Sequence, residues 1–251
     1  MFRLNKQPVI SRHAFGACMT LLMLLAHVPV SQAALTIGAT RVVFDSNKRS
    51  TSVIVSNPSN RTFAVQTWVN TAADDDTTAV PFIPSPPLFR LNPGKEQQVQ
   101  INGLPNALPN DRESLFYFNV QEIPQAEDND ANVLNIALRT RLKLFYRPSE
   151  LKENPMVSLK DLQWSIENVN GQPQLVVNNP TPFHVSFIRI EVTGNGQKQA
   201  IQNATMVEPL ARQTYALTDI KPHHGLQVLY SAINDYGGYS TPLTVPIQLA
   251  P

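Results

Sequence analysis

Apolar and polar side chains alternate along several short segments of this chain, and this pattern most limits the folds open to it. Residues 51–55, 63–69 and 98–101 each show the period of two that is typical of β-strands. Turn-forming groups separate such segments, as at Asn92-Pro93-Gly94, where proline presets the turn and glycine accepts a positive φ. Helical periodicity is hard to find. With 21 prolines and closely spaced short strands, the sequence predicts an all-β sandwich architecture.

The first 33 residues have the layout of a secretory signal peptide. Basic residues come first, a largely apolar run covers residues 14–30, and small residues at 31 and 33 suit cleavage. A membrane anchor is the alternative, but it needs about 20 continuous apolar residues. Pro29 and Ser31 cut this run short. We therefore expect cleavage after Ala33 and export of the rest of the chain. The basic residues are Arg3, Lys6 and Arg12.

Cleavage would leave 218 residues with a formal charge near −2, because the whole chain carries +1 and the leader holds three basic residues. A weakly acidic protein has no electrostatic basis for general nucleic-acid binding. The only cysteine, Cys18, would leave with the leader, so the mature protein must be stable without a disulfide. Its length suits one large or two ordinary domains.

Two weak internal repeats favour two domains. Residues 51–58 are echoed by residues 174–180, and Leu91-Asn92-Pro93 is echoed by Val207-Glu208-Pro209 in the same order. Either echo could come from turn chemistry alone, but their shared order favours two related sandwiches. The natural boundary is Arg147-Pro148, where a proline cannot continue the preceding strand. We therefore predict domains at residues 34–148 and 149–251.

Residues 133–147 alternate over fifteen positions, whereas a strand usually has about five or six residues. One face presents Leu134, Ile136 and Leu138 in its early half. An ordinary long strand with one face on the core would give the same pattern. A strand that pairs with a partner is the other interpretation, since a long apolar edge invites aggregation unless something covers it. The opposite face carries four cations, Arg139, Arg141, Lys143 and Arg147.

Several segments resemble the periplasmic pilus-assembly chaperones. Residues 108–124, which read LPNDRESLFYFNVQEIP, closely resemble the signature of that family. Residues 143–148 and 233–238 match the family as well, and residues 40–44 fit its first strand. The resemblance covers essentially all of residues 34 to about 240 and is closest to the P-pilus chaperone branch. It implies two immunoglobulin-like β-sandwiches in an L-shaped arrangement.

The resemblance also implies a binding mechanism. A pilus subunit of this system lacks its last strand, and the chaperone lends one of its own, which is donor-strand complementation. In this chain the side chains that fill the subunit's open core would be Leu134, Ile136 and Leu138. Arg41 and Lys143 would anchor the subunit's C-terminal carboxylate, because cations in a partly desolvated cleft bind a carboxylate strongly.

A charge network between the domains is implied at Glu113, Arg147 and Asp235, with ordinary surface ion pairs as the alternative. The short connection from Pro124 to Ala131 is similar to that of the short-loop class. The implied partners are pilus subunits and an outer-membrane usher, the implied compartment is the periplasm, and neither ATP nor a cofactor is expected. The sequence leaves open whether the free protein self-associates to hide its donor strand.

Motifs of catalysis and metal binding are missing from the sequence. It contains no Gly-x-Ser-x-Gly elbow, no Walker loop and no His-Glu-x-x-His. The adjacent His223 and His224 lack further ligands at metal spacing. The contiguous Asp74-Asp75-Asp76 differs from the spaced ligands of a calcium loop and predicts a solvated hairpin tip. His184, in a predicted strand at 183–187, is expected at the surface or the edge of a core. We therefore expect a binding protein without catalytic residues.

Two other binding proteins remain as alternatives. A pilus subunit is usually a single incomplete domain with a disulfide, whereas the mature chain has two predicted domains and no cysteine. An extracellular two-domain immunoglobulin-like adhesion module would fit the predicted fold. It would not explain the apolar face of residues 134–138 together with Arg41 and Lys143.

Overall fold

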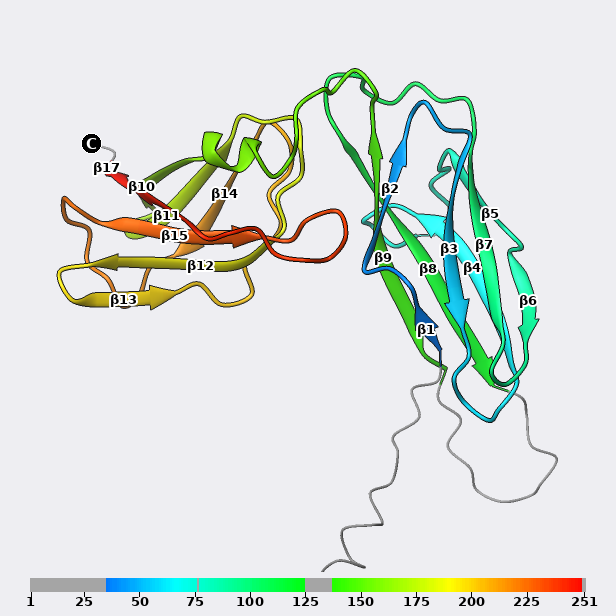
Figure 1. Ribbon diagram of the computed structural model, residues 1–251. Coiled ribbons are helices and arrows are strands. Elements are labelled where there is room, and N and C mark those ends of the chain that lie inside the picture. Colours follow the sequence, from blue (N-terminus) through cyan, green and yellow to red (C-terminus); the bar gives the residue numbers. More distant parts are fainter. Residues whose placement is uncertain (1–34, 76, 125–136, 250–251) are drawn as a thin grey trace, which may run out of the picture. The chain divides into compact units, whose positions relative to one another are not determined.

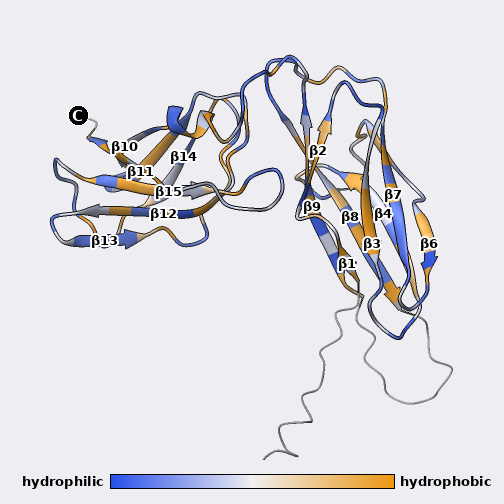
Figure 2. Ribbon diagram, in the orientation of Figure 1, coloured by the Kyte–Doolittle hydropathy of each residue, from blue (hydrophilic) through white to orange (hydrophobic). Residues whose placement is uncertain are grey.

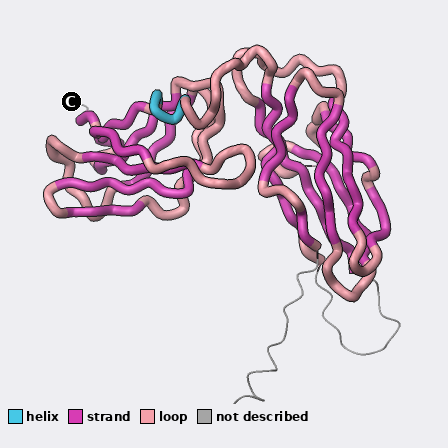
Figure 3. The backbone as a smooth tube through the Cα atoms, in the orientation of Figure 1, coloured by secondary structure: helices cyan, strands magenta, loops and turns pink. Residues whose placement is uncertain are grey.

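Two β-sandwiches make up the part of the chain that the computed structural model describes, which is residues 35–75, 77–124 and 137–249. The first contains β1 to β9 and the second β10 to β17 (Figure 1). Figure 3 shows strands throughout; the one helical element within the described ranges is a short 3-10 turn, η1 (Ser158–Asp161). The prediction of two all-β sandwiches is confirmed, and the L-shaped arrangement stays a prediction.

The first sandwich has one sheet of order β1-β3-β7-β5 and a second of order β2-β9-β8-β4-β6. Its core contains large enclosed side chains from both sheets, among them Phe118, Leu144 and Ile101. Its strands are β1 (Thr36–Ile37), β2 (Arg41–Asp45), β3 (Ser50–Ser56), β4 (Phe63–Asn70), β5 (Phe82–Ser85), β6 (Leu88–Leu91), β7 (Glu96–Gly103), β8 (Ser114–Pro124) and β9 (Arg139–Arg147).

The second sandwich has sheets of order β14-β11-β10-β17 and β13-β12-β15-β16. Its separate core is centred on Tyr230, Leu175 and Ile190. Its strands are β10 (Gln163–Val169), β11 (Gln172–Asn179), β12 (Phe187–Gly194), β13 (Gln197–Ala200), β14 (Ala211–Ala216), β15 (Gln227–Ala232), β16 (Leu243–Pro246) and β17 (Gln248–Leu249).

The alternation of apolar and polar residues in the sequence corresponds to alternately buried and more exposed side chains in the strands. The predicted strands at 51–55, 63–69 and 98–101 are β3, β4 and β7. In β4 the residues from Phe63 to Val69 alternate between buried and less buried positions, because successive side chains of a strand point to opposite faces. Figure 2 shows the same alternation of hydrophobic and hydrophilic residues along the strands. The predicted turn at Gly94 has a φ of 65°, which glycine adopts readily.

The weak sequence repeat corresponds to a repeated buried asparagine. The amide nitrogen of Asn57 donates to two backbone carbonyls, and its oxygen accepts from the backbone and hydroxyl of Ser59. Asn179 makes the same four contacts, with Thr181 in the place of Ser59. Both asparagines are at most 1% exposed. An Asn-Pro step therefore closes the same kind of loop in both sandwiches.

The strand β9 lies between two neighbours that cover different lengths of it. On one side, β8 pairs antiparallel with it from Tyr146 back to Arg139. On the other side, β2 pairs parallel with residues 143–147 only. Residues 139–142 therefore have a backbone edge without a neighbouring strand on the β2 side, within the described part of the chain.

The sequence predicted a strand over residues 133–147, but its described part begins as a strand at Arg139. Leu138 still accepts a backbone hydrogen bond from Glu122 in β8, and residues 133–136 lie outside the described residues. The predicted two-faced pattern is also incomplete. Phe145 should lie on the outer face, yet it is only 4% exposed because it packs against His184 of the second sandwich.

The predicted signal peptide, residues 1–33, lies outside the described residues. In the ranges that the structure does describe, no helix has the length and apolar character needed to cross a membrane. β9 ends at Arg147 and the second core begins at Leu159, whereas the domain boundary after Pro148 stays a prediction. The segment between them connects the two sandwiches.

Candidate functional site

Arg41 and Lys143 lie side by side because β2 and β9 pair in parallel, with these two residues as register partners. Both side chains are partly buried, and both reach groups of the second sandwich. The Arg41 Nη1 donates to the backbone oxygen of Ile233 at 3.1 Å. The Lys143 Nζ donates to the hydroxyl of Ser186 at 3.0 Å. The pairing of strands within the first sandwich thus places two cations against the second.

Both cations are partly desolvated, and neither forms an ion pair with a carboxylate of the described residues. Burial lowers the pKa of Lys143, and the nearby charge of Arg41 lowers it further. Burial also lowers the pKa of Arg41, although the charges of Asp235 and Glu113 oppose this. No ion pair among the described residues includes either cation, and the buried Nε of Arg41 has no hydrogen-bond partner there. An incoming carboxylate would satisfy both groups.

The other cations of β9 are already paired or stacked. Arg139 donates to the carboxylate of Asp74, and the guanidinium of Arg141 lies 3.8 Å from the ring centre of Tyr117 and donates to the backbone oxygen of Thr71. The hydrogen bond from Arg139 lowers the pKa of Asp74. Asp74 is exposed, as predicted for a solvated acidic tip, but it is also paired with Arg139 because the loop after β4 folds onto β9. Asp76 lies outside the described residues.

Glu113, Arg147 and Asp235 form a continuous network of charged hydrogen bonds. Arg147 donates through Nε to Glu113 at 2.8 Å and through both terminal nitrogens to Asp235 at 2.7 and 2.9 Å. Burial alone would lower the pKa of Arg147. The hydrogen bonds to both carboxylates and their charges outweigh burial, so the pKa is raised. Glu113 directly precedes β8 of the first sandwich, and Asp235 lies between β15 and β16 of the second. The network therefore links the two sandwiches.

His184 completes this network, and sequence reasoning missed it. Its backbone nitrogen and its Nδ1 both contact the second carboxylate oxygen of Glu113, at 2.8 and 3.1 Å. The predicted strand at 183–187 begins only at Phe187, and the His184 side chain is 5% exposed. Ser186 and Ile233, which hold Lys143 and Arg41, were also missed as contacts. Neither their residue type nor their spacing carries a signal, because each contact joins segments far apart in the chain.

Replacing Arg147 with Ala should destabilise the protein by about 2–3 kcal/mol. Removing one partner of a buried pair typically costs about 3–5 kcal/mol, and the cost should be smaller here because Arg147 is 19% exposed. Urea unfolding would measure it. Arg112→Ala is the matched control, since Arg112 pairs with Asp111 at the exposed surface, and it should leave the unfolding midpoint unchanged. Equal midpoints for both variants would contradict a structural role for the network.

Of the predicted donor residues, only Leu138 lies in the described part of the chain. Its side chain is 56% exposed and lies directly before β9. Leu134 and Ile136 lie outside the described residues. The exposed Leu138, the free edge of residues 139–142 and Lys143 thus follow one another along the chain, and Arg41 of β2 lies beside Lys143.

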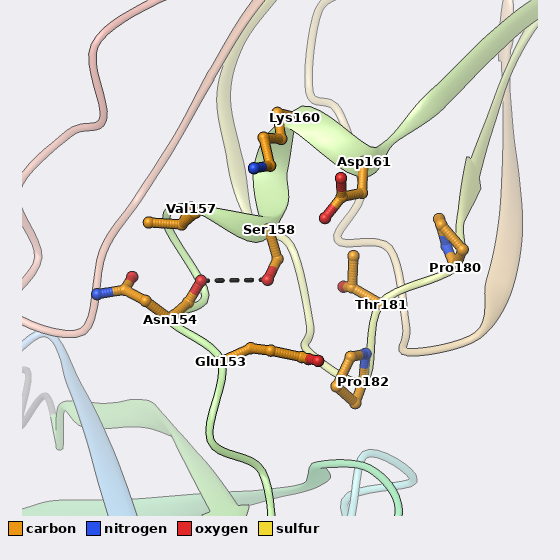
Figure 4. Close-up of a pocket in the computed structure, with 9 residues that line it drawn as sticks. All are labelled: Glu153, Asn154, Val157, Ser158, Lys160, Asp161, Pro180, Thr181 and Pro182. Atoms are coloured by element: carbon orange, nitrogen blue, oxygen red, sulfur yellow. Dashed lines mark hydrogen bonds between the residues drawn. The ribbon is translucent and has the colours of Figure 1, made fainter.

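An open pocket of about 540 Å³ lies beside η1 in the second sandwich (Figure 4). Its charged residues, Glu153, Lys160 and Asp161, are all exposed, and Ser158 donates its hydroxyl to the backbone of Asn154 at 3.2 Å. The pocket therefore has no buried charged side chain in its lining. Within the described ranges, no three His, Cys, Asp or Glu side chains gather as a metal site requires.

Two family models match the chain, one for each sandwich. Residues 34–152 match the N-terminal domain of PapD, described as a pili and flagellar-assembly chaperone. Residues 158–243 match the C-terminal domain of the pili assembly chaperone PapD. The chain belongs to the PapD family of pili assembly chaperones. The resemblance seen in the sequence is thereby confirmed, and a chaperone family is not a class of enzymes.

Known members of the PapD family cover most of this chain. The chaperone protein FimB/FhaD of Bordetella pertussis is 38% identical over 225 residues, which is 86% of this chain and 89% of the relative. PapD of Escherichia coli is 36% identical over 227 residues, covering 86% and 90%. The solved structure of the Salmonella enterica SafA pilin in complex with the SafB chaperone has a TM-score of 0.72 at 30% identity, covering 85% of this chain and 96% of that one.

Proposed function

We propose that this chain is a periplasmic chaperone that binds unfinished pilus subunits along β9 and delivers them to an outer-membrane usher. Membership of the PapD family supports the chaperone role, and the SafA pilin complex of a related chaperone supports a pilus subunit as the partner. The leader-like residues 1–33 support export to the periplasm. Binding alone would supply the free energy, so neither ATP nor a cofactor is required.

The observation that carries this proposal is the half-covered edge of β9. Residues 139–142 have a backbone edge without a neighbouring strand, and that edge ends where Arg41 and Lys143 lie side by side. A strand of the subunit could pair with the free edge until it meets β2. Its terminal carboxylate would then bind the two desolvated cations. The free edge and the cation pair thus suit the same partner, an extended segment that ends in a carboxylate.

The donor side chains would provide most of the affinity. Burying Leu134, Ile136 and Leu138 in the subunit would contribute about 1.5–3 kcal/mol each. Together this gives roughly 5–9 kcal/mol before the cost of ordering the two segments. Main-chain hydrogen bonds would hold the strands together, and the carboxylate anchor would fix their register. A shift by one residue would turn every donor side chain away from the subunit's core.

The network of Glu113, Arg147, Asp235 and His184 would act as a brace for this site. Arg41 and Lys143 belong to the first sandwich, but their hydrogen-bond partners Ile233 and Ser186 belong to the second. The position of both cations therefore depends on how the sandwiches are held together. The network supplies charge-assisted bonds for that purpose, which are stronger than neutral hydrogen bonds.

Co-purification tests the proposed function. The tagged full-length chain would be expressed with a cysteine-containing pilus subunit encoded beside it, and the periplasmic fraction would be purified on the tag. We expect the subunit to travel with the chaperone and to be degraded when the chaperone is omitted. Absence of any subunit on the tag, with both proteins present in the periplasm, would show that the chain has another function.

A further inference from the structure

The connection between β15 and β16 contains a tight loop, residues 234–238, that is fixed by its own hydrogen bonds. The side-chain oxygen of Asn234 accepts from the backbone nitrogens of Tyr236 and Gly238, at 3.0 and 2.9 Å. The backbone nitrogens of Asn234 and Gly237 close it further through bonds to Gly238 and Asn234 at 2.8 and 3.0 Å. Gly237 has a φ of 83°, which favours glycine. The loop therefore has little freedom to change shape.

The same loop lies directly against the cation pair. The residue before it, Ile233, accepts the hydrogen bond from Arg41, and its Asp235 forms the bidentate pair with Arg147. Gly237 lies so close to the first sandwich that a Cβ at this position would overlap the hydroxyl of Thr40, the neighbour of Arg41. Three successive contacts therefore fix the loop next to the proposed carboxylate anchor.

Tyr236 projects from this fixed loop with 96% of its surface exposed. On either side of it, Asp235 is bound by Arg147 and Gly237 lies close to Thr40, so the backbone of Tyr236 is restricted as well. An exposed tyrosine on a rigid backbone provides contact area at low entropic cost, which is why tyrosine is enriched at binding hot spots. Tyr236 is thus available for a contact, three positions along the chain from the residue that binds Arg41.

We propose that Tyr236 is a second contact for the pilus subunit, and that it packs against the subunit's surface beside the C-terminal segment bound by Arg41 and Lys143. The proposal rests on the proposed function and adds a binding residue from the second sandwich to it. The chemistry of the contact is that of an aromatic ring on apolar or peptide surface, with the phenol hydroxyl left toward water. Strand pairing on β9 and the Tyr236 contact would then hold the subunit from both sandwiches.

Tyr236→Ala tests this inference in the full-length chain, co-expressed with the adjacently encoded pilus subunit. The complex should dissociate about ten to a hundred times faster than wild type after dilution, because hot-spot residues carry this share of affinity. Tyr236→Phe should retain most of the lifetime, since the ring remains. Val169→Ala, at the exposed last residue of β10, is the matched control and should have no effect.

The outcomes separate the two proposals. If wild type captures the subunit and Tyr236→Ala releases it at the wild-type rate, the inference is wrong and the chaperone function stands. If wild type captures no subunit, the proposed function itself is wrong. Thermal unfolding of the free variants guards against misfolding, since an exposed side chain should not change the melting temperature. A second result would also contradict the inference. If Tyr236→Ala lowers the melting temperature and Tyr236→Phe releases the subunit equally fast, the effect comes from a change in the loop's fold and not from a lost contact of the ring.

Discussion

Replacing Lys143 with Ala should leave both sandwiches folded but abolish stable capture of pilus subunits. In the proposed complex the lysine and Arg41 together bind the subunit's terminal carboxylate in a partly desolvated position. Truncating one partner of such a pair typically costs about 2–5 kcal/mol, which is roughly thirtyfold to several thousandfold in affinity. The subunit should be missing from the purified chaperone, because the complex would dissociate during purification.

Lys143→Met tests whether lost capture comes from the missing charge and not from a less stable chaperone. The pKa of Lys143 is lowered in the folded protein, first by burial and then by the charge of Arg41. A cation with a lowered folded pKa costs stability at every pH below that pKa, and the cost disappears only as the pH rises past the unfolded value. Neutral pH lies below the unfolded pKa of lysine, so the cost is present there. Removing the charge with Met should therefore not lower the melting temperature of the free chaperone, although capture is lost.

The matched control is Lys152→Ala. Lys152 is exposed in the segment after β9 and donates to the backbone of Ser149, so it has the same charge without the desolvated setting. It should capture subunits as wild type does. Capture by Lys143→Met at the wild-type level would remove Lys143 from the anchor. Loss of capture in all three variants would indicate a general electrostatic attraction between chaperone and subunit.

The strands could be predicted from the sequence because alternation follows directly from strand geometry. The segment 63–69 is the clearest case, since every second residue must enter the core of a two-layered sandwich. Lys143 could be singled out in the same way, as a cation near the predicted domain boundary. Arg41 could not, because a single arginine in an edge strand is usually solvated. The family resemblance named it, and the parallel pairing of β2 with β9 places it beside Lys143.

The missed features all depend on contacts between distant segments. His184 was predicted as a surface or core-edge residue of a strand, but its nearest polar partner is Glu113, 71 positions earlier. Asp74 is exposed as predicted, but its ion pair with Arg139, 65 positions later, was not foreseen. In each case the residue type fits several environments, and the tertiary fold selects one. A local pattern carries no information on that choice.

The four cations of β9 have different partners and therefore different roles. Asp74 and Tyr117 engage Arg139 and Arg141, and the network to the second sandwich engages Arg147. Of these four cations, only Lys143 has a neutral hydroxyl, that of Ser186, as its polar partner among the described residues. The fold therefore neutralises or stacks the cations on either side of Lys143 and leaves this one available for a ligand. That distribution is what a carboxylate anchor at one defined position requires.

Replacing Leu138 with Asp should block subunit binding even though the free chaperone remains stable. Leu138 is 56% exposed in the free protein, and substitutions at exposed positions usually change stability by less than about 0.5 kcal/mol. In the proposed complex the same position lies inside the subunit's core. The aspartate would lose the burial of the leucine, about 1.5–3 kcal/mol, and add an uncompensated buried charge that costs several kcal/mol more. Ile136→Asp should act in the same way.

Ala137→Asp supplies the control that makes this test specific to one face of the strand. Ala137 is exposed and adjacent to Leu138, so the new charge sits in the same segment and differs only in the direction of its side chain. In a complex formed by strand pairing, residue 137 points away from the subunit's core, and its carboxylate stays hydrated. Co-purification should therefore recover the subunit with Ala137→Asp and not with Leu138→Asp. Equal recovery with both would mean that residues 134–138 are not the donor strand, whereas equal loss would point to charge repulsion without a two-faced insertion.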